Sequence, residues 1–152
     1  MPAGEGFFVD SNVLLYYVDP IARDKQIRCA AWLDALWMTG TGRLSWQVLH
    51  EFYWNAVKKM RLEPARARQM VEDLSHWRPV DTSLGLIERA WQWMDSSQVP
   101  YWDALILAAA ERVGARYLLS EDFPANRSYQ DIQILNPLDY APTEFLRPEG
   151  SA

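Results

Sequence analysis

Short apolar runs alternate along this chain with longer segments whose apolar residues recur at helical spacing. Runs such as Phe7-Phe8-Val9 are typical of strands buried on both faces of a sheet, and parallel strands need helical connections between them. We therefore predict an α/β fold, a three-layer α/β/α sandwich with a mainly parallel central sheet. The expected strands are residues 7–9, 43 to 45 or 46, 117–120 and 132–135, with a brief edge strand at 79–81.

Capping and breaking residues set the limits of the expected helices. Asp10, Ser11 and Asn12 are typical of a helix start, whereas Gly40 and Gly114 are typical of helix ends. The expected helices begin near Asp10, at Asp24 as an N-cap, at Gln47, at Pro64, at Thr82 or Ser83 as a cap, and at Tyr101.

The chain's size and composition exclude several classes of protein. A length of 152 residues suits one domain, so we expect residues 1–142 to form a single domain and residues 143–152 a loose tail. No apolar run approaches the ~18 residues that cross a bilayer, and the N-terminus lacks a signal peptide, so we expect a cytoplasmic protein with no membrane contact. One Cys and two His cannot form a four-ligand zinc site, so any metal must bind oxygen.

Four carboxylates fall where a parallel sheet places its ligands. Asp10 follows the first strand, Glu51 lies in the helix after the second, Asp122 lies just past strand 117–120, and Asp103 begins an otherwise apolar helix. Because ligands bind outside the carboxyl ends of parallel strands, we expect these acids at one edge. Each alone has a simpler explanation as a helix cap, a solvated helix position, a dipole partner or a turn residue.

Taken together, the four acids favour a divalent cation. Carboxylates at one sheet edge repel each other, so either some pKa values rise or a cation compensates the charge. Mg²⁺ and Mn²⁺ prefer oxygen ligands, and their chemistry on nucleic acids is phosphodiester hydrolysis.

The segments that carry these acids resemble the motifs of PIN-domain ribonucleases. The matching segments are residues 7–14, 44–54, 101–106 and 118–123, in the same order and spacing. The resemblance covers roughly Phe7 to Pro137 and is closest to the VapC toxins of type II toxin–antitoxin systems, which also tend to carry Asn-Pro after the last strand, as Asn136-Pro137 does here.

The resemblance implies a Mg²⁺- or Mn²⁺-dependent endoribonuclease. It implies that Asp10, Glu51, Asp103 and Asp122 hold the metal and that Ser11 or Asn12 orients the first acid. It also implies a homodimer, and an antitoxin partner that inserts a basic segment into the acidic groove. Related domains often carry a further acid shortly after the position of Asp122, where this chain has Asn126 as a neutral oxygen ligand or a turn residue.

Other residues are candidates for RNA contact or for packing. The net charge of −5 argues against general nucleic-acid coating, but one segment concentrates cations, namely Lys58, Lys59, Arg61, Arg66 and Arg68. These are our RNA-binding candidates, with a solvated helix face as the alternative. Trp46 and Trp102 are the candidate base contacts. We expect Trp32, Trp37, Trp77 and Trp91 to pack in the core or at a subunit interface, His50 to be structural and Glu121 to face solvent.

The hypothesis that results is hydrolysis of single-stranded or looped RNA by water at the acidic site, leaving a 5′-phosphate. Three other functions are alternatives to it. A phosphoacceptor receiver domain normally has a second acid beside the position of Asp10 and a Lys after the last strand, and this chain lacks both. A haloacid-type phosphatase needs Asp-x-Asp, where this chain has Asp10-Ser11-Asn12. The third rival is a non-catalytic PIN-fold module that binds RNA or a partner.

Overall fold

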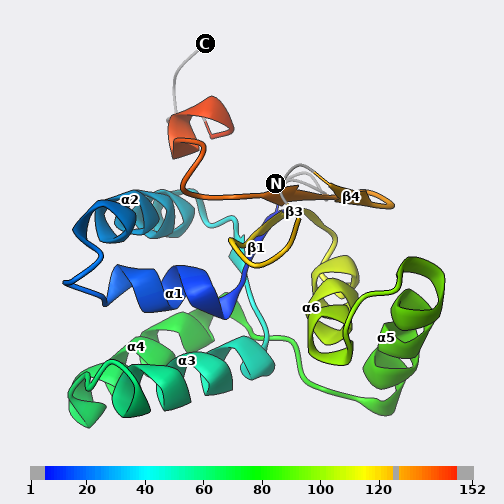
Figure 1. The fold of residues 1–152 in the computed structure, drawn as a ribbon, viewed down its shortest axis with the longest axis horizontal. Coiled ribbons are helices and arrows are strands. Elements are labelled where there is room, and N and C mark those ends of the chain that lie inside the picture. The colour runs from blue at the N-terminus through cyan, green and yellow to red at the C-terminus, as the bar shows by residue number, and fades with distance from the viewer. Residues whose placement is uncertain (1–5, 125–126, 147–152) are drawn as a thin grey trace.

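A five-stranded sheet with the order β2-β1-β3-β5-β4 forms the centre of the computed structural model, which describes residues 6–124 and 127–146 (Figure 1). β1 pairs in parallel with β2 and β3, and β3 pairs in parallel with β5, whereas β4 runs antiparallel at the edge. The strands are β1 Gly6–Val9, β2 Gly42–Arg43, β3 Ala115–Leu119, β4 Ser128–Tyr129 and β5 Ile132–Leu135.

Six α-helices connect and cover these strands. Figure 1 shows α1 to α4 gathered in one group and α5 and α6 side by side in another. The connection from β1 to β2 and the connection from β2 to β3 cross the sheet in opposite directions, so right-handed crossovers put α2 and α6 on opposite faces. The predicted three-layer α/β fold is confirmed. The helices are α1 Ser11–Tyr17, α2 Arg23–Thr39, α3 Trp46–Lys58, α4 Pro64–Leu74, α5 Leu84–Ser97 and α6 Tyr101–Arg112.

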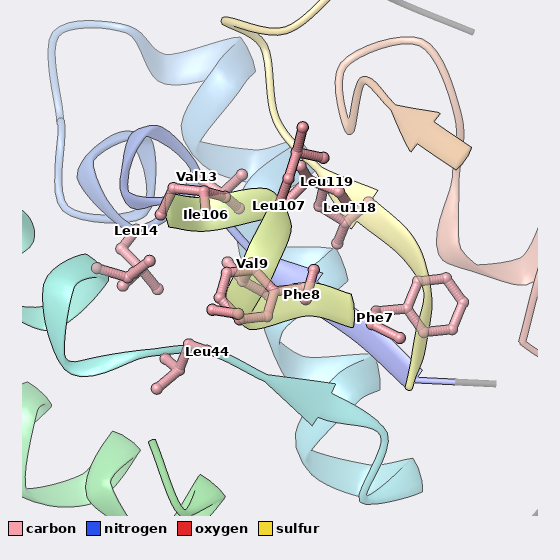
Figure 2. Close-up of a cluster of buried hydrophobic side chains, with 14 of the residues drawn as sticks. Phe7, Phe8, Val9, Val13, Leu14, Leu44, Ile106, Leu107, Leu118 and Leu119 are labelled. Carbon is pink, nitrogen blue, oxygen red and sulfur yellow. The ribbon is translucent and has the colours of Figure 1, made fainter. Parts of the chain in front are cut away.

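The core holds α6 firmly against the sheet. Figure 2 shows side chains of β1, among them Phe8, gathered with Leu107 of α6 and Leu118 of β3. Seven consecutive residues of α6, 104–110, are buried, so this helix has almost no freedom to shift. The position of Asp103 in its first turn is therefore fixed by the core.

The predicted cap at Ser83 is confirmed, and α3 begins at Ser45, a cap that the sequence analysis placed in a strand. Ser45 Oγ accepts a hydrogen bond from Val48 N, and Ser83 Oγ accepts one from Leu86 N. Asp24 is not the N-cap of α2, because Ala22 takes that position and its carbonyl accepts from Gln26 N at 2.9 Å. Asp24 instead lies in the first turn, where its charge faces the positive end of the helix dipole.

Several strand predictions differ from the structure, beginning with the strand expected at 43 to 45 or 46, which is β2 Gly42–Arg43 and is followed by α3 from Trp46. The expected edge strand at 79–81 is a single bridge between Val80 and Ser45. The sequence does not predict β4, because a strand of two residues is too short to show the alternation of apolar and polar side chains. None of the described helices is long and apolar enough to cross a membrane.

The expectation of a loose tail from residue 143 is wrong for residues 143–146. Pro142–Glu144 forms a 3₁₀ turn, and the ring of Phe145 packs against Trp32 and Tyr117 with centroid distances of 6.1 and 5.3 Å. Burial of this aromatic ring against α2 and β3 anchors the segment. Trp32 is fully buried as expected, whereas Trp37 and Trp91 are 44% and 50% exposed.

Candidate active site

Asp10 is a buried carboxylate at the carboxyl end of β1. Only 5% of the residue is exposed. Its Oδ1 accepts a hydrogen bond from Ser11 N at 2.8 Å, which makes it the N-cap of α1, and its Oδ2 accepts one from Ser120 Oγ at 2.8 Å. Burial raises its pKa from 3.8 to about 7, an effect that the two hydrogen bonds partly offset.

Asn12 lies between Asp10 and Asp122. Its Nδ2 is 3.2 Å from Asp10 Oδ2, 3.2 Å from Asp122 Oδ2 and 3.1 Å from Ser120 Oγ. An amide has only two protons on this nitrogen, so three acceptors share them. Its Oδ1 accepts from Glu121 N at 3.1 Å, which ties α1 to the loop that carries Asp122.

Glu51 reaches the same edge from α3 and is held on both carboxylate oxygens. Its Oε2 accepts from Ser11 Oγ at 2.8 Å, and its Oε1 accepts from Gln47 Nε2 at 2.9 Å. The Gln47 amide also donates to the backbone carbonyl of Trp102 at 3.2 Å. Gln47 therefore joins the start of α3 to the start of α6.

Asp103 completes the group from the first turn of α6. Its pKa is raised first by burial and then by the charges of Asp122 and Glu51. Asp10 is also affected by Glu51 and Asp122. Asp10 and Asp103 therefore each lie close enough to Glu51 and Asp122 for those charges to raise their pKa values.

Hydroxyl and amide groups separate these carboxylates. Within the described part of the chain, no group of three or more His, Cys, Asp or Glu side chains is arranged to hold a metal ion. The hydrogen bonds explain this, because the Asn12 amide bridges Asp10 and Asp122 while Ser11 engages Glu51. The four acids would nevertheless offer only oxygen ligands, which is the ligand type that a hard divalent cation prefers.

Sequence reasoning assigned no role to Ser120 or Gln47. Ser120 is fully buried directly after β3, donates to Asp10 and accepts from Asp122 N at 3.1 Å. A polar residue ending a buried apolar strand was the available signal for Ser120. Gln47 had no such signal, because it is one of several polar residues on a helix.

Replacement of Ser120 by Ala should destabilise the protein in a pH-dependent way. The Ser120 hydroxyl lowers the pKa of Asp10, so its loss raises that pKa further and leaves the charged form of Asp10 with one donor fewer. We expect the free energy of unfolding to fall by about 1–3 kcal/mol at pH 8 and by less at pH 4. Urea denaturation at both pH values measures this, with the exposed Ser128→Ala as the control. An equal loss at both pH values would mean that Ser120 acts only through packing.

The expectation that Glu121 faces solvent is wrong. Its carboxylate accepts a hydrogen bond from the Tyr16 hydroxyl and pairs with Lys25 Nζ at 3.1 Å. These partners come from α1 and α2, which pack beside the loop after β3. The contacts anchor the loop that carries Asp122, so Glu121 helps to hold the site in place.

The remaining candidates lie outside the acid cluster. Asn126 falls outside the described residues. His50 is exposed on α3. The basic residues are exposed at the end of α3, in the following loop and on α4, and Arg68 Nε donates to the Tyr53 hydroxyl at 3.2 Å. They are Lys58, Lys59, Arg61, Arg66 and Arg68.

Comparison with known proteins identifies one family. A family model described as the PIN domain matches residues 7–126 of this chain. The matched segment includes Asp10, Glu51, Asp103 and Asp122. A search of curated proteins gave no match.

Proposed function

Because the chain belongs to the PIN domain family, whose members are generally nucleases, we propose that it is a Mg²⁺- or Mn²⁺-dependent endoribonuclease and the toxin of a cytoplasmic toxin–antitoxin pair. The observation that carries the proposal is the meeting of four carboxylates from four separate segments at one edge of the sheet. Asp10, Glu51, Asp103 and Asp122 are the residues that would hold the metal.

A divalent cation bound there supplies a Lewis acid that polarises the phosphate and makes water a better nucleophile. The protein's part is to hold the acids in place. Ser120 and Asn12 fix Asp10 and Asp122, while Ser11 and Gln47 fix Glu51. Attack of water on phosphorus with departure of the 3′-oxygen leaves the phosphate on the 5′ end of the product.

The surroundings of the acid cluster support an RNA substrate and a basic protein partner. The exposed cations Lys58 to Arg68 offer phosphate contacts at the far end of α3. An acidic groove is complementary to an Arg or Lys of an antitoxin segment that would block it. The antitoxin and the homodimer rest on the resemblance to VapC toxins, including Asn136-Pro137 after β5.

Metal titration tests this proposal. Protein stripped with EDTA is titrated with Mg²⁺ and with Mn²⁺ by calorimetry, and cleavage of single-stranded and looped RNA is measured at saturation. We expect saturable binding, and cleavage only when metal is present. If the protein neither binds metal nor cleaves RNA, the non-catalytic PIN-fold module becomes the better explanation.

A further inference from the structure

An aromatic hollow adjoins the acid cluster on the side of Glu51. It has a volume of about 790 Å³ and lies between the starts of α3 and α6. Its size is within the usual range of ligand sites, roughly 300–1,000 Å³. Its lining includes Trp46, Gln47, Glu51, Asp81, Tyr101 and Trp102.

Trp102 is an exposed residue whose backbone is held in place by the buried helix α6. The residue is 64% exposed although it belongs to the most deeply buried helix of the fold. Its ring meets Tyr101 at a centroid distance of 5.2 Å, and its carbonyl accepts a hydrogen bond from Gln47. Because the backbone of α6 is fixed by the core, little backbone entropy is lost when a ligand stacks on this indole.

The charge of the hollow suits a base better than a phosphate. Glu51 and Asp81 are among the residues that line it, and none of its described lining residues is Lys or Arg. A phosphate inside would meet two carboxylates, whereas a nucleobase is neutral and carries N–H donors for carboxylate oxygens. Aromatic side chains stack on any base, because every base has a π-face.

The hollow is continuous with the acid cluster and with a second, smaller hollow. Glu51 belongs both to the hollow's lining and to the cluster. Trp46 and His50 line both hollows, and the second, of about 280 Å³, is also lined by Arg68. An RNA strand with one phosphodiester at the acids would therefore have this hollow next to it, because Glu51 belongs to both.

We propose that this hollow is a nucleobase site, in which one unpaired base of the RNA stacks on Trp102 beside the phosphodiester that is cut. The inference rests on the proposed ribonuclease function and adds a reason for substrate choice. A base that is paired within a duplex cannot enter the hollow without being unstacked. The site therefore selects single-stranded or looped RNA.

The test is a cycle between a protein variant and a modified RNA. An RNA oligonucleotide with one cleavage site is prepared in versions that each replace one base near that site with an abasic ribose. We expect one abasic position to lower kcat/KM of the wild-type protein by about 5- to 150-fold, the range that stacking on one aromatic ring supplies. Trp102→Ala should lower kcat/KM by a similar factor on intact RNA. For this variant, removal of the same base should lower kcat/KM little further, because the stacking contact is already absent.

Two variants serve as controls. Trp102→Phe retains an aromatic ring and should recover most of the activity that Trp102→Ala loses. Trp91→Ala removes a Trp that is 50% exposed on α5 and should behave as wild type. Unfolding free energies of all variants show whether a loss of activity reflects a loss of folding.

Two results would overturn the inference. In the first, Trp102→Ala cleaves intact RNA as fast as wild type. In the second, the factor by which Trp102→Ala lowers kcat/KM is the same on every abasic RNA as on intact RNA. Either result would leave a peptide as the better occupant of the hollow. If wild-type protein cleaves no RNA, the proposed function fails, and the same cycle measured as Kd by fluorescence anisotropy still decides whether the hollow binds a base.

Discussion

Asp10→Asn is expected to lower kcat for RNA cleavage by at least about 10³-fold while the protein still folds. Asparagine retains the shape of the side chain and the oxygen that accepts from Ser11 N, so α1 keeps a good N-cap. It lacks the negative charge that would hold a divalent cation between the acids. The measurement is kcat at saturating Mg²⁺ on the RNA that wild-type protein cleaves best, with metal affinity determined by calorimetry.

Matched substitutions show whether activity falls because a metal ligand is lost or because any carboxylate charge is removed. Asp103→Asn should behave like Asp10→Asn, because Asp103 lies in the same group of interacting acids. Asp131→Asn removes an exposed carboxylate between β4 and β5 and should retain the wild-type rate. Cleavage by Asp10→Asn within about tenfold of wild type would exclude Asp10 from the catalytic group.

The sequence predicts those parts of the site whose causes are local. Phe7, Phe8 and Val9 form an apolar run that is typical of a buried strand, so the residue that follows it is expected at the sheet edge. Asp122 follows from β3 by the same reasoning, and Glu51 and Asp103 follow from the helices that leave this edge. Each of these inferences needs only a few neighbouring residues.

The contacts that link the acids are set by packing between distant segments. Ser120 Oγ bonds to Asp10 across a separation of 110 residues, and the Tyr16 hydroxyl bonds to Glu121 across 105. No local pattern determines which polar side chain of a strand end or helix meets which acid. This is why Ser120 and Gln47 were not recognised and why Glu121 was assigned to solvent.

Asn12 makes both kinds of contact, one with a sequence neighbour and one with a distant segment. The sequence places Asn12 next to the first acid, which is a local relation. Its bond to Asp122 at 3.2 Å depends on how α1 meets the loop after β3, and that relation follows only from the folded chain. The result is that the Asn12 amide bridges Asp10 and Asp122.

The metal-free protein is expected to lose stability as the pH rises from 4 to 8, in a way that Asp10→Asn removes. The pKa of Asp10 is raised from 3.8 to about 7 by burial, so the folded state binds this proton more tightly than the unfolded state does. The stability that Asp10 contributes is complete below about pH 4 and is lost as the pH rises through the folded pKa. The two pKa values correspond to roughly 4 kcal/mol between the extremes.

The measurement is the free energy of unfolding in urea, with EDTA present, at several pH values for wild type and Asp10→Asn. Other titrating groups are common to both proteins, so the difference between the two curves reports Asp10. We expect Asp10→Asn to be the more stable protein at pH 8 and the advantage to disappear toward pH 4. A variant less stable than wild type by several kcal/mol at pH 8 would instead show that the charged carboxylate of Asp10 supports the fold as a cap.

Addition of Mg²⁺ at pH 8 tests whether the charged Asp10 belongs to a metal site or is only an unfavourable buried charge. A cation that binds only the folded state stabilises it by about 2.7 kcal/mol at a hundred times its Kd. Wild-type protein should therefore recover stability on addition of Mg²⁺, and Asp10→Asn should recover little, because its acids bind the ion weakly. Equal stabilisation of both proteins would show that the ion binds elsewhere on the surface. Metal binding would then not account for the free-energy cost of burying the charged Asp10 carboxylate.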